Sequence, residues 1–411
     1  MQTTLAPEFV GTPEGAEAEA ILRRCVHCGF CTATCPTYQL LGDELDGPRG
    51  RIYLIKQVLE GETPTRKTQL HLDRCLTCRN CETTCPSGVQ YGHLVDIGRK
   101  LVDAQVPRPA GEKAVRWALK EGLSSPLFGP AMKLGQGLRG ALPEALRAKV
   151  PAPQAVGALP TRQHARKVLL LAGCVQPAMA PNIHAATARV LDAAGIESVL
   201  APKAGCCGAV KFHLNDQEGG LAQMRANIDA WWPLVERGEV EAIVMNASGC
   251  GATVKDYGHQ LRHDAQYAER AARISALTRD LSELLPELVP LLQNRVRALP
   301  EGVVAYHPPC TLQHGQKLRG GVETHLRALG FDMRVASSES HLCCGSAGTY
   351  SVLQPELSAS LRARKLGHLQ AQAPAVIASA NMGCITHLQA GTQTPVRHWV
   401  ELLDAALAPA A

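Results

Sequence analysis

The stretch CVHCGFCTATCP at residues 25–36 places four cysteines and a proline in twelve residues, and CLTCRNCETTCP at residues 75–86 repeats the pattern. Both stretches read C-x2-C-x2-C-x3-C-P. The 411 residues contain 16 cysteines, and residues 1–24 show no basic cluster followed by an apolar stretch that would mark export. Disulfide frameworks belong to small secreted domains, so metal or redox chemistry is the better interpretation.

This spacing is the signature of bacterial two-cluster ferredoxins. Three thiolates at steps of three residues can surround one cubane, while the fourth, carried away by its proline, faces the other cluster. Structural zinc also takes four thiolates, but its sites combine two separated C-x2-C pairs and have no use for a third cysteine at the same step. We therefore expect two 4Fe-4S clusters with crossed ligands: Cys25, Cys28, Cys31 and Cys85 for the first, and Cys75, Cys78, Cys81 and Cys35 for the second.

The segment between the two cysteine stretches, GDELDGPRGRIYLIKQVLEG at residues 42–61, predicts a Gly/Pro turn followed by an amphipathic helix. Arg49 and Arg51 lie near this turn, where they could contact a partner or an anionic cluster, but a solvated turn is the expected environment. His27 is expected to be a polar neighbour of the first cluster rather than a ligand. The predicted apolar face of the helix consists of Ile52, Ile55, Val58 and Leu59.

The rest of the sequence contains an internal repeat. Each unit has an apolar stretch ending in Cys, a helical stretch, a Cys-Cys-Gly turn, a second helical stretch, and an apolar stretch ending in Gly-Cys. Short continuous apolar stretches separated by helices indicate parallel strands buried on both faces, and ligands bind beyond the carboxyl ends of such strands. The cysteines of the two units are Cys174, Cys206, Cys207 and Cys250, then Cys310, Cys343, Cys344 and Cys384.

Adjacent cysteines followed by Gly208 or Gly345 are hard to explain by packing alone, although a free cysteine also packs as a small hydrophobe. Glycine at this position allows close backbone approach or a positive φ, as a turn that cradles a ligand needs. Four thiolates could hold a further cluster, serve dithiol chemistry or hold no cofactor, and we favour at least one further cluster. His213, His314 and His341 lie close by and are expected to be polar neighbours, metal ligands or proton carriers.

These patterns predict an α+β multidomain protein. We expect a helical two-cluster ferredoxin-like domain at residues 1–100, a basic connector at 101–165, and repeated α/β Cys-Cys-Gly domains at 166–295 and 296–411. No G-x-G-x-x-G motif lies between a strand and a helix, so neither a flavin site nor a catalytic residue is assigned. The net charge of +5 and the lack of interleaved basic and aromatic residues argue against a nucleic-acid partner.

Residues 99–167 carry 13 basic and 4 acidic side chains, and prolines separate short amphipathic pieces such as EKAVRWALKEGL. Such pieces could lie on an anionic bilayer surface, with Trp117, Leu119, Leu127 and Phe128 inserted and the basic side chains on the phosphates. The alternative is a solvated connector that packs on the second half of the chain. No stretch of the sequence approaches the roughly 18 apolar residues of a spanning helix.

The quoted motifs, together with AGCCGAV, NASGCGA, CTLQH and HLCCGSAGTY, resemble the iron-sulfur subunits of bacterial glycolate oxidases, and the likeness covers nearly the whole chain. The resemblance implies a cytoplasmic subunit, peripheral on the inner face of the membrane in one interpretation. It would pass electrons from a separate FAD-containing subunit, which oxidises glycolate to glyoxylate, towards membrane quinone. Related Cys-Cys-Gly proteins leave another 2-hydroxy acid, glycerol 3-phosphate or a heterodisulfide as alternative substrates.

The sequence departs from this group at one position in each repeat. The group's full pattern ends in C-x2-C and gives five thiols per repeat, the number that its non-cubane clusters use. Here Ala247 stands three residues before Cys250, and Asn381 stands three residues before Cys384. Each repeat therefore offers four thiols, so we expect no five-thiolate cluster in either, which counts against a disulfide reductase.

Overall fold

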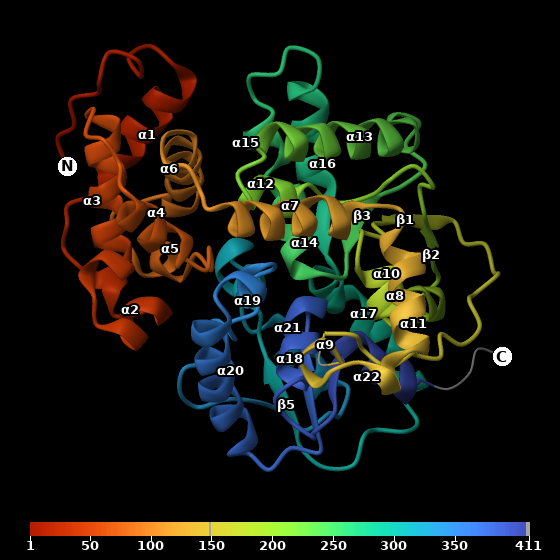
Figure 1. Ribbon diagram of the computed structural model, residues 1–411. Helices are drawn as coiled ribbons and strands as arrows, with labels where there is room; N and C mark the ends of the chain where they lie inside the picture. Colours follow the sequence, from red (N-terminus) through yellow and green to blue (C-terminus); the bar gives the residue numbers. More distant parts are fainter. Residues whose placement is uncertain (148, 408–411) are drawn as a thin grey trace.

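The structure, a computed structural model, describes residues 1–147 and 149–407. A helical N-terminal module lies beside two α/β domains, and the chain passes between them through a helical connector (Figure 1). Each α/β domain is built on a parallel sheet. The fold class expected from the sequence is confirmed.

The N-terminal module packs its helices around one apolar core. Helix α3 begins at Pro48, since proline suits the first turn of a helix, and it buries the predicted apolar face. Gly98 lets α3 and α6 approach closely, because a Cβ atom there would lie 2.5 Å from Cγ1 of Ile55. The helices of the module are α1 (Pro13–Arg24), α2 (Pro36–Leu41), α3 (Pro48–Leu59), α4 (Arg66–Asp73), α5 (Asn80–Thr84) and α6 (Tyr91–Gln105).

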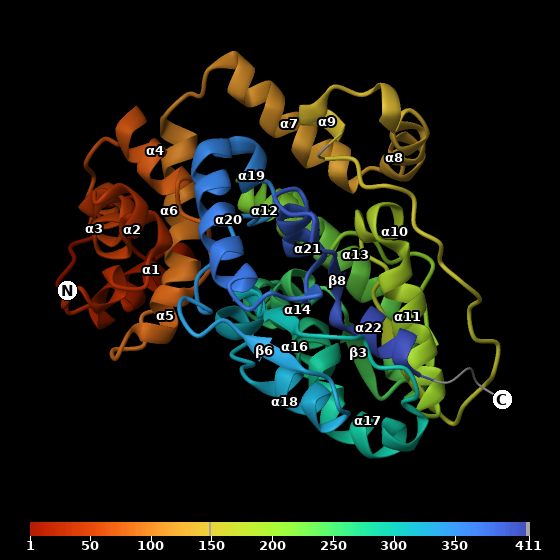
Figure 2. The ribbon, with the colours of Figure 1, turned by 90° about the horizontal axis from the view of Figure 1, so that it is seen from below.

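The connector is helical and packs along the first α/β domain (Figure 2). Helix α7 packs against α12 and helix α8 against α10. Two ion pairs fasten α7, from Lys120 to Asp216 at 3.1 Å and from Glu121 to Lys211 at 3.0 Å. The connector helices are α7 (Ala110–Ser124), α8 (Phe128–Gly137) and α9 (Glu144–Arg147).

The two α/β domains repeat one topology. Their four-stranded parallel sheets have the orders β2-β1-β3-β4 and β6-β5-β7-β8 among the described residues. The strands are β1 (Arg166–Leu170), β2 (Ile196–Val199), β3 (Ala242–Met245), β4 (Thr278–Asp280), β5 (Val304–His307), β6 (Met333–Val335), β7 (Val376–Ser379) and β8 (Val396–His398). The helices of the first domain are α10 (Gln176–Met179), α11 (Pro181–Ala193), α12 (Ala209–His213), α13 (Gln217–Glu236), α14 (Ser248–Lys255), α15 (Tyr257–Gln260), α16 (Ala268–Leu277) and α17 (Leu285–Leu292). Those of the second are α18 (Gly321–Ala328), α19 (Tyr350–Leu353), α20 (Pro355–Gln370), α21 (Met382–Gln389) and α22 (Trp399–Ala406).

The two α/β domains share a hydrophobic core. Helix α22, at the end of the described chain, packs against α11 of the first domain, and the fully buried Trp399 and Ile183 belong to one apolar cluster. Arg189 of α11 pairs with Asp404 of α22 at 2.7 Å. Near the carboxyl ends of the sheets, the Ser248 N–H donates to the Ala380 carbonyl at 3.1 Å. The two repeats therefore form one packed unit.

The N-terminal module contacts the second α/β domain through neutral hydrogen bonds. The Tyr350 hydroxyl donates to the Arg74 carbonyl at 3.1 Å, and the Asn80 side chain donates to the His341 carbonyl at 3.4 Å. Thr83 and His314 are joined at 3.0 Å. Helices α19 and α20 lie beside the module in both ribbon views (Figures 1 and 2).

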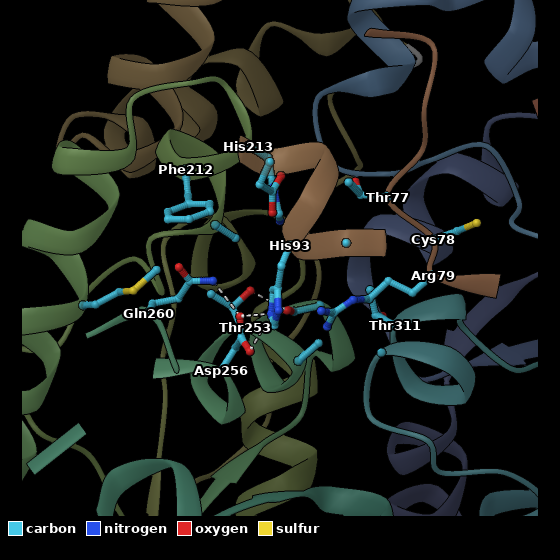
Figure 3. A pocket seen from close by; sticks show the side chains of 17 residues that line it. Thr77, Cys78, Arg79, His93, Phe212, His213, Thr253, Asp256, Gln260 and Thr311 are labelled. Carbon is cyan, nitrogen blue, oxygen red and sulfur yellow. Dashed lines mark hydrogen bonds and ion pairs between the residues drawn. The ribbon is translucent and has the colours of Figure 1, made fainter. Parts of the chain in front are cut away.

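An ionic cluster joins the same module to the first α/β domain (Figure 3 shows its His93 and Asp256). His93 Nε2 lies 3.2 Å from Oδ1 of Asp256. Glu17 Oε1 lies 2.8 Å from His259 Nε2, and its Oε2 lies 2.5 Å from Arg262 Nη2. The imidazole rings of His93 and His259 stack with centroids 3.9 Å apart. Arg262 on the carboxylate makes this cluster an ion-pair network rather than a cation site.

The pKa shifts in this cluster show that both carboxylates are charged near neutral pH. Burial raises the pKa of Glu17, but His259 and Arg262 outweigh it and lower the value to about 2. Burial also raises the pKa of Asp256, and His93 more than reverses the effect. Burial lowers the pKa of His93, yet Asp256 brings it above the usual value. Removing one partner would leave the others desolvated and unpaired.

We expect Glu17→Gln to lower the free energy of unfolding by about 1 to 3 kcal/mol, because Arg262 and His259 lose their carboxylate. Urea unfolding of the anaerobically purified holo-protein, followed by visible cluster absorbance, measures this. Since the folded pKa of Glu17 is lowered to about 2, its contribution is present above the unfolded value of 4.5 and is lost as the pH falls towards 2.

The matched control is Glu14→Gln. Glu14 also reaches from α1 to α6, where it pairs with Lys100, but both side chains are more than two-fifths exposed. A much smaller change is expected from it. Equal losses in both variants would show that the ionic cluster does not hold the module in place.

Candidate iron-sulfur sites

The first N-terminal cavity gathers cysteines from both ends of the module. Arg49 lies at its wall and pairs with Glu44 at 2.6 Å. Cys28 is exposed there, while Cys25 is buried. The described residues that line this cavity include Cys25, Cys28, Cys31, Cys81 and Cys85. The structure thus brings the four expected ligands of the first cluster to one cavity, although Cys85 follows them by more than fifty residues in the sequence.

The second N-terminal cavity lies deeper. Tyr91 and Arg51 lie at its wall, and both are buried. The cysteines that line it are Cys35, Cys75, Cys78 and Cys81. These are the residues that the sequence suggests for the second cluster, with Cys35 contributed by the first cysteine stretch.

The backbone of both cysteine loops bends in the same left-handed way. His27 and Thr77, at matching positions, have φ values of 57° and 49°. Gly29 and Arg79 also match and have φ values of 84° and 59°. Left-handed backbone is uncommon for residues other than glycine, and the surrounding structure must over-determine it. The repeated strain indicates loops shaped around similar groups.

The chemistry of the two cavities suits an anionic thiolate cluster. Their described lining contains arginines and no carboxylate. Burial raises the pKa of Cys31 to about 11, and burial together with the nearby Cys310 raises the pKa of Cys78 well above its usual value. Such thiols stay protonated at neutral pH unless a metal replaces the proton. Each cavity offers at least the four thiols that a 4Fe-4S cluster needs.

Arg51 corrects one expectation. It does not lie in a solvated turn: its side chain is 1% exposed and its Nε donates to the His71 carbonyl at 2.7 Å. Burial lowers the pKa of Arg51, but Cys75 and other neighbours raise it above its usual value. The reason is that α3 begins at Pro48, so Arg51 falls on the buried face of the first helical turn. It thereby places a fixed positive charge beside the second cavity.

The Cys-Cys-Gly turns have the conformation that the sequence predicts. Gly208 and Gly345 have φ values of 93° and 91°. A Cβ atom at Gly208 would lie 2.7 Å from the Gly220 carbonyl oxygen, and one at Gly345 would lie 2.5 Å from that of Ser358. The prediction of positive φ and close approach is confirmed. The first turn is therefore held tightly against α13 and the second against α20.

Helices α14 and α21 present the last cysteine of each repeat. Cys250 and Cys384 lie in the first turns of these helices. Ala247 and Asn381 are the N-cap residues. The Asn381 amide donates to Cys384 Sγ at 3.6 Å. Neither position supplies a thiol, as the sequence requires.

The cysteines of the two repeats meet at one interdomain cavity of about 260 Å³. It lies beyond the carboxyl ends of both sheets, and Leu76 and Thr77 of the N-terminal module also reach it. Cys310 Sγ lies 3.8 Å from Cys343 Sγ. The cysteines that line it are Cys174, Cys206, Cys207, Cys250, Cys310, Cys343 and Cys384. Cys344 is buried outside this lining.

Within the first repeat, hydrogen bonds between the thiols lower the pKa of one cysteine and raise the pKa values of its neighbours. Bonds from Cys174 and Cys207, aided by the Gly208 N–H, lower the pKa of Cys206. The same bonds, together with burial, raise the pKa values of Cys174 and Cys207. Cys206 is therefore the first thiolate of this set, ready to ligate a metal or to react.

The three histidines named from the sequence are polar contacts between domains. His213 Nδ1 lies 3.2 Å from Asp96 of the N-terminal module. His314 bonds Thr83, and burial lowers its pKa to about 4. The His341 carbonyl accepts from Asn80 of the N-terminal module at 3.4 Å and also bonds His314 Nε2 at 2.9 Å within its own domain.

Sequence reasoning missed a fourth histidine, His307. It ends β5 three residues before Cys310, and its only local signal is the short motif YHPPC. Its imidazole lies beside Cys344 and Cys384, which belong to distant segments.

No helix in the described part of the chain is long and apolar enough to span a membrane.

Comparisons with known proteins match two kinds of domain in this chain. A family model for the 4Fe-4S dicluster domain matches residues 21–89, and one for the cysteine-rich domain matches residues 168–255 and 304–389. The chain is 56% identical over 410 residues to the glycolate oxidase iron-sulfur subunit of Escherichia coli (strain K12), covering 99% of each chain.

Two more distant relatives also match the chain, one over most of its length and one over part of it. The chain is 30% identical over 404 residues to the probable glycolate oxidase iron-sulfur subunit of Bacillus subtilis (strain 168), covering 91% of this chain and 90% of that one. It is 28% identical over 251 residues to lactate utilization protein A of Geobacillus thermodenitrificans (strain NG80-2), covering 58% of this chain and 98% of that protein. On identity across its full length, the chain belongs to the family of glycolate oxidase iron-sulfur subunits.

Proposed function

We propose that this chain is the electron-transfer subunit of a glycolate dehydrogenase. It would receive electrons from an FAD-containing partner subunit that oxidises glycolate to glyoxylate, and deliver them towards membrane quinone. Glycolate gives up two electrons and two protons in this reaction, and quinone takes up two of each. Bound iron-sulfur clusters would supply one-electron transfer between the flavin and the acceptor. This chain then needs no substrate pocket and no catalytic residue.

The observation that supports the proposal is the succession of thiol sets through the molecule. Cys81, Pro48 and Tyr91 line both N-terminal cavities. Leu76 follows Cys75 and packs against Cys310 and Cys343 of the second repeat. The interdomain cavity then brings together cysteines of the second and first repeats. Each set is next to another, as a series of one-electron carriers requires.

We assign the ligands in crossed sets. Cys25, Cys28, Cys31 and Cys85 would hold the first cluster, and Cys75, Cys78, Cys81 and Cys35 the second. A further cluster in the Cys-Cys-Gly repeats would extend the path beyond these two. Arg49 and Arg51 would each offset part of the negative charge beside one cavity.

The crossed assignment predicts which cysteine variants share a phenotype. We expect Cys85→Ala and Cys28→Ala to alter one 4Fe-4S signal in EPR of the reduced protein, and Cys78→Ala to alter the other. Each variant should lose up to about four of the irons of one cluster. Iron and acid-labile sulfide analysis gives the second readout. If Cys85→Ala and Cys78→Ala changed the same signal, the ligands would not be crossed.

The surface beside the first cavity is the candidate docking face for the flavin subunit. Cys28 is exposed there, and Val26 and Phe30 of the same loop are 67% and 61% exposed. Tyr53 on the adjoining helix is 46% exposed. Exposed apolar side chains around a redox centre suit a partner that must approach closely and exclude water.

Anaerobic purification of the tagged chain from its own cells tests the proposed function. We expect an FAD protein to copurify and glycolate to reduce both N-terminal clusters in the complex, with glyoxylate as product. Phe30→Asp should weaken the complex about tenfold or more, because it puts a charge into the apolar contact. Leu291→Asp, at a 48% exposed position on α17, is the control.

Other outcomes separate the alternatives. If glycerol 3-phosphate or lactate reduced the clusters and glycolate did not, the complex would have a different substrate, but the electron-transfer role would stand. Disulfide reduction by the isolated chain, with no flavin protein attached, would overturn the proposal.

We propose that the connector makes peripheral contact with the inner face of the cell membrane. Trp117, Leu127 and Leu134 are each about two-thirds exposed or more, and Lys113 and Lys133 are exposed on the same helices. Of the side chains named from the sequence, Leu119 and Phe128 are half-buried instead. The exposed apolar and basic side chains together suit an anionic lipid surface.

Sedimentation with vesicles of phosphatidylserine and phosphatidylcholine measures this contact. We expect binding at low salt that weakens at high salt, and a bound fraction about tenfold lower for the Trp117→Ser, Leu127→Ser double variant. Leu299→Ser, at another exposed leucine, is the control. If the protein sedimented equally with and without vesicles, the proposed membrane contact would be contradicted.

A further inference from the structure

His307 is a buried imidazole with no partner. Its side chain is 1% exposed, and neither ring nitrogen has a hydrogen bond within the described residues. Its carbonyl oxygen is satisfied by the Ser379 hydroxyl at 2.9 Å, so only the ring is left unpaired. An unsatisfied buried polar group costs about 1 to 3 kcal/mol, and in native proteins it calls for an explanation such as a ligand.

The neighbours of this imidazole are thiols. One ring nitrogen of His307, Cys344 Sγ and Cys384 Sγ all lie within 4.8 Å of one another. The three residues come from β5, the Cys-Cys-Gly turn and the first turn of α21. All three are buried. Neutral imidazole nitrogen and thiolate sulfur are the ligands preferred by zinc and by iron-sulfur centres.

Other buried histidines of the same domain have at least one paired ring nitrogen. His398 Nδ1 accepts from the Val400 N–H at 3.1 Å, although its Nε2 has no partner within the described residues. His314 bonds Thr83 and the His341 carbonyl, and His387 Nε2 lies 3.3 Å from the Ser358 hydroxyl. Burial alone therefore does not leave an imidazole unpartnered in this domain. The free ring of His307 is particular to its place beside the thiols.

The first repeat has no equivalent of this arrangement. The residue three before Cys174, in the place of His307, is the buried Leu171. The second repeat also carries Lys365, which is 2% exposed and donates to the Glu339 carbonyl. At the same distance after the first Cys-Cys-Gly turn stands the buried Ile228. Lys365 would balance the charge of metal-bound thiolates, and the first repeat offers no such cation at that position.

We propose that His307 is a metal ligand, which completes a mixed nitrogen and sulfur site with Cys344 and Cys384 in the second repeat only. The imidazole would supply the additional donor that Asn381 does not, in a repeat with four thiols. The site takes a thiophilic metal, present either as a single zinc ion or as part of an iron-sulfur cluster. This inference does not depend on glycolate or on any partner.

The spacing of the donor atoms bears on the two forms. Ligands of one tetrahedral metal with bonds of about 2.3 Å lie about 3.8 Å apart, whereas thiolates on different irons of a cubane lie farther apart. Donors within 4.8 Å of one another, and the Cys310 to Cys343 separation of 3.8 Å, are compact. A compact donor set suits a single ion or irons that share ligands.

Metal analysis and spectroscopy of the full-length holo-protein, labelled with 15N-histidine and purified anaerobically, test the site. We expect metal beyond the roughly eight irons of the N-terminal clusters. A histidine nitrogen should appear either in pulsed EPR of the reduced protein or in zinc-edge X-ray absorption. The pulsed EPR signal identifies an iron-sulfur centre, and the zinc edge identifies a single ion.

Variants at position 307 localise the metal. His307→Leu, which copies the first repeat, should lose the nitrogen signal and one metal centre, while the N-terminal EPR signals remain. His307→Cys should retain the metal without the nitrogen signal. The proposal is overturned if the wild-type protein holds only the N-terminal irons, or if His307→Leu keeps the same metal and the same spectra. If the wild-type protein showed no EPR signals from the N-terminal clusters, the proposed electron path would be contradicted, and the metal site at His307 would not.

Discussion

The crossing of the fourth cysteine in each stretch is the constraint on which the N-terminal module depends. Cys85 reaches the cavity of the first loop and Cys35 that of the second, so neither loop can close around its group alone. The intervening helices must then pack at one fixed spacing, and Cys25, Cys75 and Cys81 are members of their hydrophobic core. Because the candidate ligands are also core residues, metal binding would be coupled to folding of this module.

The duplicated α/β domains have diverged where their chemistry would differ. Strand order, the left-handed glycine (Gly208 or Gly345), and the helix that contains each last cysteine are the same in both. The packing of the turns requires the glycines, since a side chain at Gly208 would collide with α13 and one at Gly345 with α20. The interior beside the thiols is free to vary, and there the second domain has a buried imidazole where the first has an aliphatic side chain.

The local sequence pattern was enough to predict the features that depend only on residues close together in the sequence. The helix at Pro48–Leu59, the parallel strands and the positive φ of the glycines follow from periodicity and turn chemistry. The burial of Arg51 and the position of His307 depend on contacts between segments far apart. Arg51 meets the His71 carbonyl only after α3 and α4 pack, and His307 meets Cys384 because β5 pairs with β7. The spacing of residues within one segment cannot predict such contacts.

Two kinds of contact hold the N-terminal module, and they suit different tasks. Ion pairs such as Glu17 with Arg262 fix it to the first α/β domain at a partly exposed edge. In its contact with the second domain, Leu76 packs on Cys343, and these residues are 4% and 3% exposed. An apolar surrounding controls solvent access and dielectric at a redox site. The buried apolar contact is therefore the one suited to electron transfer, while the ion pairs fix the module to the first domain.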